Sequence, residues 1–383
     1  MPRVCLLVPT LRTRDAIGHD VAGMYAVLRQ RGIEVHVLTQ DLLHNVALPV
    51  ERLARYAEYA QQPDTITIYH HSTFWEAGLP LFLAAAGAKI VRYHGVTPPG
   101  FFAPYSDELA YSTTEGRAQT ALLARSDRVD LFLSDSDYNR RELQSLGAPA
   151  AGGAVAPPFH TLDELENLPA DVRLLQRYLD GTCNVLFVGR VAPNKGHRHL
   201  LGVLSAFRQL FSRPVRLFVV GHLDSRLRAY HKEIAALARA LQVDDMAVFT
   251  GRVDPAQLKA YYLLAHAFLV MSEHEGFCVP VVEAMAHAVP LVAYDATAVG
   301  ETVGDGGLVL PGLDYDHYAA ALETVMARAE LRESLAARQR ARVVDRFSPA
   351  KVARQFEQAL APWLGPAPAA GAGAERAHGT VAS

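Results

Sequence analysis

The chain has little cysteine. Its 383 residues include three, Cys5, Cys183 and Cys278, which lie far apart. An odd number without close spacing excludes a disulfide framework and gives no zinc-binding pattern. A reducing cytosol is therefore the simpler interpretation.

Long apolar runs are also missing. No stretch of about 18 apolar residues occurs, so no membrane-spanning helix is expected. The run from Val4 to Val8 ends at Pro9, and this short segment predicts a strand rather than a signal peptide. The protein is expected to be cytoplasmic, and peripheral contact with the inner face of the membrane is compatible with this composition.

Neither sign of charge dominates. The chain has 37 basic and 40 acidic residues, which gives a net charge of −3. This balance gives no support for a nucleic-acid partner, which usually needs a basic domain. With 50% hydrophobic and 20% charged residues, the composition is that of a soluble globular protein. The length predicts two domains, each large enough for its own core.

The first half alternates short apolar runs with helical stretches, which predicts an open α/β sheet. Strands are predicted over residues 4–8, 34–38, 65–69, 89–93 and 131–134, and helices over 19–30, 51–61 and 113–127.

The second half repeats this pattern after residues 150–158, which are rich in Ala, Gly and Pro and predict a linker. Strands are predicted over 184–188, 215–220, 247–250, 267–271 and 290–294, and helices over 170–179, 200–210, 224–241, 281–288 and 348–364. We therefore predict two doubly wound domains, residues 1–165 and 166–347, with a disordered tail over 365–383. Ligands bind at the carboxyl ends of parallel strands, so a site is expected in the cleft between the sheets.

Two acidic residues flank a predicted helix start. Glu275 and Glu283 are separated by seven residues, and Pro280 between them suits the first helical position. Unpaired N–H groups at such a start favour anions or polar hydroxyls. A carboxylate here can accept two hydrogen bonds from a vicinal diol or favour positive charge at a sugar carbon. Taken alone, a capped helix with a surface Glu explains the pair about as well.

Two cations follow the strand predicted over residues 184–188. Arg190 comes directly after Gly189, and Lys195 precedes Gly196. A guanidinium fork and a mobile ammonium suit an anionic ligand, although a solvated basic loop is an equally good account. Gly221, after the next strand, would let the backbone approach a ligand closely.

Three histidines, His70, His71 and His94, follow predicted strands of the first half. A structural role is favoured for His70. For His94 a functional role is favoured, because Gly95 and the turn over residues 98–100 fix an exposed loop there. No metal site is expected, since no helical H-x-x-x-H or Cys/His spacing occurs.

Four blocks of the second half occur in the order found in a known family. They are Gly189-Arg190 with Lys195-Gly196, Phe249 to Val253 with Leu258 to Ala265, Ser272 to Pro290 with its Glu275 and Glu283, and Glu301-Thr302 with Gly306-Gly307. Together they resemble the family 4 glycosyltransferases, whose E-x7-E motif the third block matches. The first half resembles that family more loosely, at His94-Gly95 and over residues 134–143.

The resemblance implies a GT-B fold, in which two Rossmann-like domains face each other across a cleft and a final helix, here 348–364, crosses back to the first. It implies retaining transfer of a hexose from a nucleotide-diphosphate donor, with UDP slightly favoured over GDP. No metal or other cofactor is implied.

The resemblance also implies roles for residues. Arg190 and Lys195 would neutralise the leaving diphosphate, Glu275 would hydrogen-bond the donor sugar, and His94 would reach that sugar from the first domain. The donor-binding residues expected are Gly18, Gly189, Gly251, Arg252, Gly276, Phe277, Cys278, Val279 and Glu283, the last for the ribose diol.

One segment departs from the family pattern. Many members carry a glycine pair in the first strand-to-helix turn, but residues 11–20 offer only Gly18. Arg12, Arg14, Asp15 or His19 is expected to meet donor or acceptor instead. Asp15, His19 and His71 are the predicted acceptor contacts.

The acceptor itself stays open between a glycan, a lipid-linked molecule and a small molecule. Phe101 and Phe102 could touch an apolar acceptor or a membrane edge, although packing within the cleft wall is favoured. A nucleotide-sugar epimerase of the same fold and a non-catalytic nucleotide-sugar binder are the alternative functions.

Overall fold

A computed structural model describes residues 2–12, 15–41 and 48–365 of the chain. Within these residues no helix combines the length and the apolar character needed to cross a bilayer. The predicted tail over 365–383 lies outside the described residues except for Gly365, and so does Arg14.

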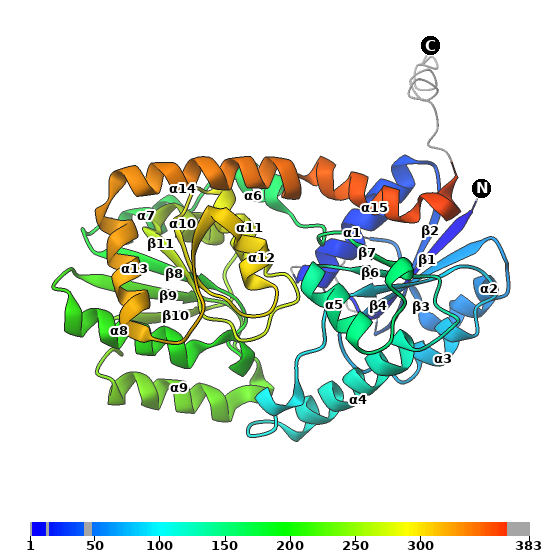
Figure 1. Cartoon of the computed structure of the whole chain (residues 1–383), viewed down its shortest axis with the longest axis horizontal. Coiled ribbons are helices and arrows are strands. Elements are labelled where there is room, and N and C mark those ends of the chain that lie inside the picture. Colours follow the sequence, from blue (N-terminus) through cyan, green and yellow to red (C-terminus); the bar gives the residue numbers. More distant parts are fainter. Residues whose placement is uncertain (1, 13–14, 42–47, 366–383) are drawn as a thin grey trace, which may run out of the picture.

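Two parallel sheets organise the molecule, as predicted (Figure 1). The first has the order β3-β2-β1-β4-β5-β6-β7 and the second β10-β9-β8-β11-β12-β13. The first comprises β1 (Arg3–Thr10), β2 (Glu34–Asp41), β3 (Val50–Arg52), β4 (Thr65–His71), β5 (Lys89–Tyr93), β6 (Leu131–Ser134) and β7 (Gly153–Val155). The second comprises β8 (Cys183–Val188), β9 (Val215–Val220), β10 (Ala247–Gly251), β11 (Ala267–Val270), β12 (Leu291–Tyr294) and β13 (Gly307–Leu310).

Helices cover both faces of each sheet (Figure 1). Those of the first half are α1 (Ala16–Gln30), α2 (Ala57–Ala60), α3 (Gly78–Leu83), α4 (Asp107–Ala124) and α5 (Asp137–Ser145). Those of the second half are α6 (Leu162–Asn167), α7 (Val172–Tyr178), α8 (His197–Leu210), α9 (Arg228–Ala240), α10 (Pro255–Leu264), α11 (Val279–Ala286), α12 (Val299–Val303), α13 (Tyr315–Ala327) and α14 (Ala329–Arg342). A π-helical turn over Val343–Phe347 joins α14 to α15 (Pro349–Leu364).

The last helix, α15, returns to the first sheet. Its residues Val352, Phe356 and Leu360 are buried in the same core as Val4 and Leu6 of β1. Figure 1 shows α14 and α15 running along one side of the molecule from the second half to the first. This is the crossing arrangement that the family resemblance implies.

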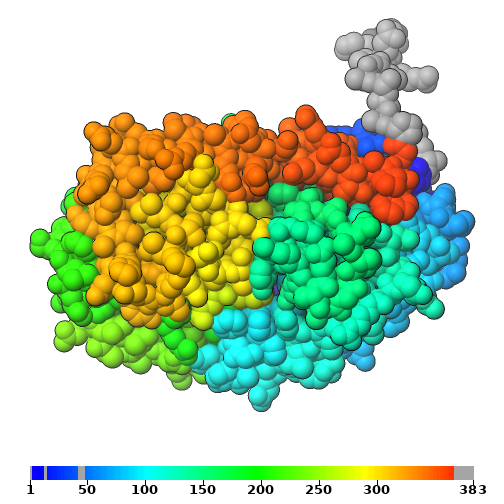
Figure 2. Space-filling view, in the orientation of Figure 1, coloured from blue at the N-terminus to red at the C-terminus, as the bar shows by residue number. Residues whose placement is uncertain are grey.

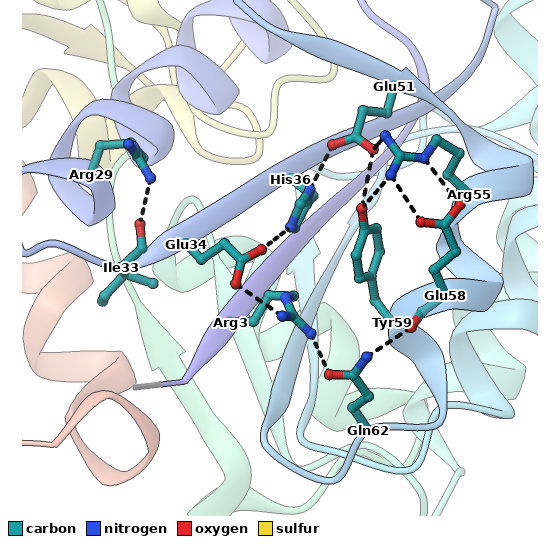
Figure 3. Close-up of polar contacts among 10 residues, drawn as sticks. All are labelled: Arg3, Arg29, Ile33, Glu34, His36, Glu51, Arg55, Glu58, Tyr59 and Gln62. Atoms are coloured by element: carbon teal, nitrogen blue, oxygen red, sulfur yellow. Dashed lines mark hydrogen bonds and ion pairs between the residues drawn. The ribbon is translucent and has the colours of Figure 1, made fainter.

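The prediction of a helix over residues 51–61 is largely wrong. Val50–Arg52 forms the edge strand β3, which pairs with β2, and Leu53–Tyr56 is a 3-10 turn. Only Ala57–Ala60 is α-helical. Glu51 contacts His36 of β2 at the sheet edge, where His36 Nδ1 lies 2.6 Å from Glu51 Oε1 (Figure 3).

The same edge carries a wider polar network (Figure 3). Arg3 of β1 donates to Glu34 of β2 at 2.9 Å. Arg55 donates to Glu58 at 3.1 and 2.9 Å. These contacts tie the strand edge to the turn that follows β3, and none of them involves a predicted site residue.

The stretch over residues 150–158 is not a free linker. Gly153–Val155 is β7, and it pairs in parallel with β6. Small side chains suit a short edge strand, and residues 153–155 show no alternation of apolar and polar side chains that would reveal it. The chain then passes to the second half, where Leu162 and Leu165 of α6 already pack in its core. The predicted boundary after residue 165 falls within this passage.

Candidate functional site

Each sheet reverses its strand order at one point, and ligands of such folds bind at the carboxyl ends of the strands there. In the second sheet this point lies between β8 and β11. The loop after β8 carries Arg190 and Lys195, and the loop after β11 carries Glu275. Three predicted site residues therefore come from the two strands that flank the crevice.

Lys195 and Glu275 are in direct contact. Lys195 Nζ lies 2.6 Å from Glu275 Oε2. The turn that carries Lys195 ends at Gly196, whose φ is +68°, and a Cβ there would lie 1.8 Å from the carbonyl oxygen of Met271. Only glycine allows this approach of the two loops. The backbone N–H of Glu275 also donates to Thr297 Oγ1 at 2.9 Å.

Arg190 is only partly neutralised. Its Nη1 lies 3.6 Å from Asp224 Oδ2, and its side chain is 39% exposed. Asp224 has a closer partner in Arg226, at 2.7 Å, and hydrogen bonds from Arg226 are the main cause that lowers the pKa of Asp224 to about 2. The guanidinium of Arg190 therefore keeps most of its capacity for an anionic ligand.

The glycines predicted to bind the donor stand at the ends of adjacent strands. Gly189 follows β8, and Gly251 ends β10. The N–H of Gly189 donates to Val220 at 2.9 Å, and the N–H of Gly221 donates to Gly251 at 3.0 Å. Their backbones thus lie side by side at the carboxyl ends of β8, β9 and β10, and Arg252 next to them is exposed.

Helix α11 begins with an unusual backbone. It starts at Val279, with Pro280 as its second residue, and its N-cap is Cys278, which has φ +76° and no side-chain capping bond. A left-handed non-glycine residue costs about 1–3 kcal/mol, and such strain gathers at functional sites. Phe277 anchors the loop by packing against Phe347, with ring centroids 5.5 Å apart. Burial raises the pKa of the Cys278 thiol, so it stays neutral.

Glu283 lies one turn into α11. The hydroxyl of Tyr262 donates to Glu283 Oε2 at 2.6 Å. Burial raises the pKa of Glu283, and the hydrogen bond from Tyr262 opposes that rise. Since Tyr262 occupies one oxygen, the other can accept from a ligand hydroxyl.

In the first domain His94 follows β5 and is held by neighbours on both ring nitrogens. Its Nδ1 lies 2.9 Å from Asp135 Oδ2, and its Nε2 lies 3.0 Å from His70 Nδ1. A carboxylate partner favours a proton on His94 Nδ1. His94 Nε2 then accepts from His70. Burial, and next the neighbouring His94, lower the pKa of His70 to about 3, so His70 stays neutral.

Beneath His94 lies a buried ion cluster. Arg92 is 1% exposed and donates to both oxygens of Asp20, at 2.9 and 3.1 Å, and its Nη2 lies 2.8 Å from Asp135 Oδ1. The sequence interpretation missed Asp20, Arg92 and Asp135 as a group. One signal was available: Arg92 interrupts an apolar strand, and a buried charge requires partners.

The two halves of the site meet at Gly276. A Cβ on Gly276 would lie 2.1 Å from the carbonyl oxygen of His94. The side chain of Asn139 sits at the same place, 3.2 Å from that Cβ position. The structure thus brings His94 of the first domain against the loop that carries Glu275.

The predicted acceptor contacts Asp15, His19 and His71 differ in their surroundings. His71 is 1% exposed, and its Nε2 lies 2.8 Å from Thr120 Oγ1 inside the core. This placement does not fit the acceptor role predicted for His71. Asp15 caps α1 by accepting the N–H of Gly18 at 2.6 Å, and the ligand contacts of both residues stay predictions. His19 is partly buried on α1.

Phe102 packs as the favoured interpretation expects. It is 2% exposed and, with Leu109, belongs to the core of the second domain, alongside Phe187 and Leu201. The segment before α4 therefore anchors the first half of the chain in the second domain.

A metal ion has one candidate position in the described part of the chain, at Asp20, His70 and His94. Asp20 Oδ2 lies 3.9 Å from both His70 Nδ1 and His94 Nε2. Both oxygens of Asp20 are already engaged by Arg92, and the two histidines hydrogen-bond each other. The donor set is therefore satisfied without an ion, and the absence of a metal stays a prediction.

Residues 180–342 match the family model described as glycosyl transferases group 1. The D-inositol 3-phosphate glycosyltransferase of Acidothermus cellulolyticus is 33% identical over 376 residues, which cover 85% of this chain and 82% of that protein. The protein of the same name from Geodermatophilus obscurus is 30% identical over 220 residues, and the match spans about half, 48%, of its length.

Among solved structures, that of Anabaena HepE in complex with UDP and glucose superposes with a TM-score of 0.72. The superposition covers 94% of this chain and all of that chain at 19% sequence identity, so it supports the shared fold alone.

Proposed function

The chain belongs to the group 1 glycosyltransferases, with the GT-B fold, and on that premise we propose that it moves a hexose from a nucleoside-diphosphate donor to an acceptor hydroxyl. We further propose that the transfer retains the anomeric configuration and needs no bound metal. One observation supports this most: the contact of Lys195 with Glu275 lies at the second-sheet crevice, where Gly276 meets His94.

In this proposal the second domain holds the donor. Arg190 and Lys195 bind the diphosphate, since both are cations at the carboxyl end of β8 and Arg190 is incompletely paired. Glu283 binds the ribose diol through the oxygen that Tyr262 leaves open. Gly251 and Arg252 lie toward the nucleobase, and Gly189 lies next to Arg190 at the diphosphate.

The sugar lies between the domains. Glu275 and the backbone of Gly276, Phe277, Cys278 and Val279 bind its hydroxyls, and His94 reaches it from the first domain. Lys195 donates to Glu275 Oε2 in the structure, so the side chain of Glu275 is oriented before the sugar arrives. The neutral His70 lies 3.0 Å from His94 Nε2 through its Nδ1, and a sugar hydroxyl would compete for this hydrogen bond.

The reaction is a front-face displacement. The bond from the anomeric carbon to the phosphate oxygen lengthens, and the sugar gains oxocarbenium character. The departing phosphate oxygen takes the proton of the acceptor hydroxyl, whose oxygen bonds to the same face of the sugar. Arg190 and Lys195 stabilise the negative charge that grows on the leaving diphosphate.

UDP is slightly favoured over GDP as the carrier. HepE, which shares the fold, is solved with UDP and glucose. For the acceptor, several relatives are named for D-inositol 3-phosphate. The first acceptors to test are therefore a phosphorylated cyclitol and then lipid-linked and free glycans. No observation favours an epimerase or a non-catalytic binder over transfer.

The test is a matrix of UDP-, GDP- and ADP-sugars with these acceptors, read as product by mass spectrometry and as anomeric configuration by NMR. A parallel series contains a chelator. We expect one nucleotide to be used, an α-linked product from an α-linked donor, and unchanged rates with chelator. Conversion of a donor without acceptor would instead indicate an epimerase, and an inverted product or a chelator-sensitive rate would overturn those parts of the proposal.

A further inference from the structure

Glu301 of the second domain completes the start of a first-domain helix. Its carboxylate accepts the backbone N–H of Asp137 at 2.7 Å and that of Tyr138 at 2.9 Å, the first two residues of α5. The next N–H, of Asn139, donates to the hydroxyl of Ser136 at 3.1 Å. The unpaired donors at this helix start are thus satisfied by both domains together.

This contact has the chemistry of a firm attachment. The first N–H groups of a helix lack internal acceptors, and the helix dipole favours a negative charge there. Glu301 is itself held in place, because Arg342 of α14 donates to the carbonyl oxygen of Thr302 at 2.9 Å and also to that of Glu301. Arg141, at 3.7 Å from Glu301 and 63% exposed, adds little.

Helix α5 in turn fixes the place where the two domains touch. Asn139 is fully buried, and its Nδ2 donates to the carbonyl oxygen of Tyr93 at 3.4 Å, one residue before His94. The same amide packs against Gly276, next to Glu275. The ring of Tyr138 meets that of His274 edge-on, with centroids 6.2 Å apart. Figure 1 shows α5 and α12 facing each other across the junction, and Figure 2 shows the corresponding segments meeting at the surface.

We propose that Glu301 is a positioning residue for the reaction: by capping α5 it holds the domains in the closed arrangement that sets His94 against the Glu275 loop. This inference rests on the proposed function for its catalytic consequence, but the contact itself is independent of it. Glu301 touches neither sugar nor phosphate in this account and acts through α5 and Asn139.

The experiment combines amide exchange with kinetics. In Glu301→Ala the amides of Asp137 and Tyr138 should exchange at least about tenfold faster, because each loses its acceptor. Turnover should fall about 10- to 100-fold, while the KM for donor changes little, since Arg190, Lys195 and Glu283 all belong to the second domain. Glu301→Gln keeps one acceptor oxygen and should recover part of both effects.

Glu233→Ala is the matched control. Glu233 also receives a hydrogen bond across the domains, from the hydroxyl of Tyr105 at 2.9 Å, but it lies on α9 away from α5. It should leave turnover and the exchange of α5 unchanged. If the amides of Asp137 and Tyr138 exchange at the wild-type rate in Glu301→Ala, the contact of Glu301 with α5 is overturned. If they exchange faster but turnover is normal, the positioning role is overturned. If the wild type transfers no sugar, the proposed function fails while the exchange measurement still decides the contact.

Discussion

The two faces of the cleft handle charge in opposite ways. On the first-domain face Arg92 is buried between Asp20 and Asp135, at 2.9 and 2.8 Å from their carboxylates. On the second-domain face Arg190 is 39% exposed and 3.6 Å from a carboxylate that prefers another arginine. The first arrangement holds His94 against Asp135 and against the neutral His70. The second leaves positive charge available for a ligand that brings its own negative charge.

The largest effect is expected from breaking the buried ion cluster of the first domain. Arg92→Met removes the guanidinium that lies between the buried carboxylates of Asp20 and Asp135 and should lower the free energy of unfolding by about 3–5 kcal/mol. Arg55→Met, which breaks the exposed pairs with Glu51 and Glu58 in Figure 3, should cost less than about 1 kcal/mol. Chemical denaturation measures both. Equal costs would show that burial does not distinguish the two kinds of pair.

The next effect is expected on the second-domain face. Lys195→Ala should lower turnover about 10²- to 10³-fold with little change in stability, because it removes charge that stabilises the leaving diphosphate. Steady-state kinetics and a thermal melt would establish this. Lys232→Ala, an exposed cation on α9, is the control and should behave as wild type. Normal turnover in Lys195→Ala would remove the phosphate role from this residue.

Lowering the pH should reduce the stability of the first domain because of its buried histidines. Burial is the main cause that lowers the pKa of His70 and His71 from 6.5 to about 3. Below pH 6.5 the unfolded chain binds protons that the folded chain does not. The free energy of unfolding therefore falls as pH falls from about 6.5 toward 3, by up to about 1.4 kcal/mol per pH unit for each histidine. Denaturation at pH 7 and pH 5 measures the slope, and His71→Gln should reduce it; an unchanged slope would contradict a neutral, buried His71.

The smallest effect concerns the ribose. Glu283→Gln keeps the hydrogen bond with Tyr262 but removes the charge, and should weaken nucleotide binding about tenfold. Calorimetry with the nucleoside diphosphate measures this, with turnover at saturating donor as a second reading. A dissociation constant equal to that of the wild type would exclude contact with the ribose.

The sequence predicted the second-domain face better than the first for a physical reason. Arg190, Lys195, Glu275 and Glu283 belong to short segments that follow single strands, so spacing along the chain already implies proximity at one sheet edge. Asp20, Arg92 and Asp135 come from a helix, a strand and a loop far apart in the sequence. Their pairing depends on the strand order β1-β4-β5-β6, which short-range patterns do not encode.

Other differences have similar causes. The edge strands β3 and β7 have three residues each and too little alternation to be recognised. Pairing with a neighbour, rather than intrinsic preference, makes them strands. The capping of α5 by Glu301 could not be predicted from the sequence, because it joins residues about 160 positions apart that lie in two different domains.

The contrast between the two faces is tested most directly by comparing how a nucleoside and its diphosphate bind. Calorimetry with uridine and UDP, and with the guanosine and adenosine pairs, would use the wild type and the Arg190→Ala/Lys195→Ala double variant. We predict that for one base the diphosphate binds at least about 100-fold more tightly than the nucleoside, and that the double variant loses most of this difference. Equal affinities for nucleoside and diphosphate in the wild type would contradict the account.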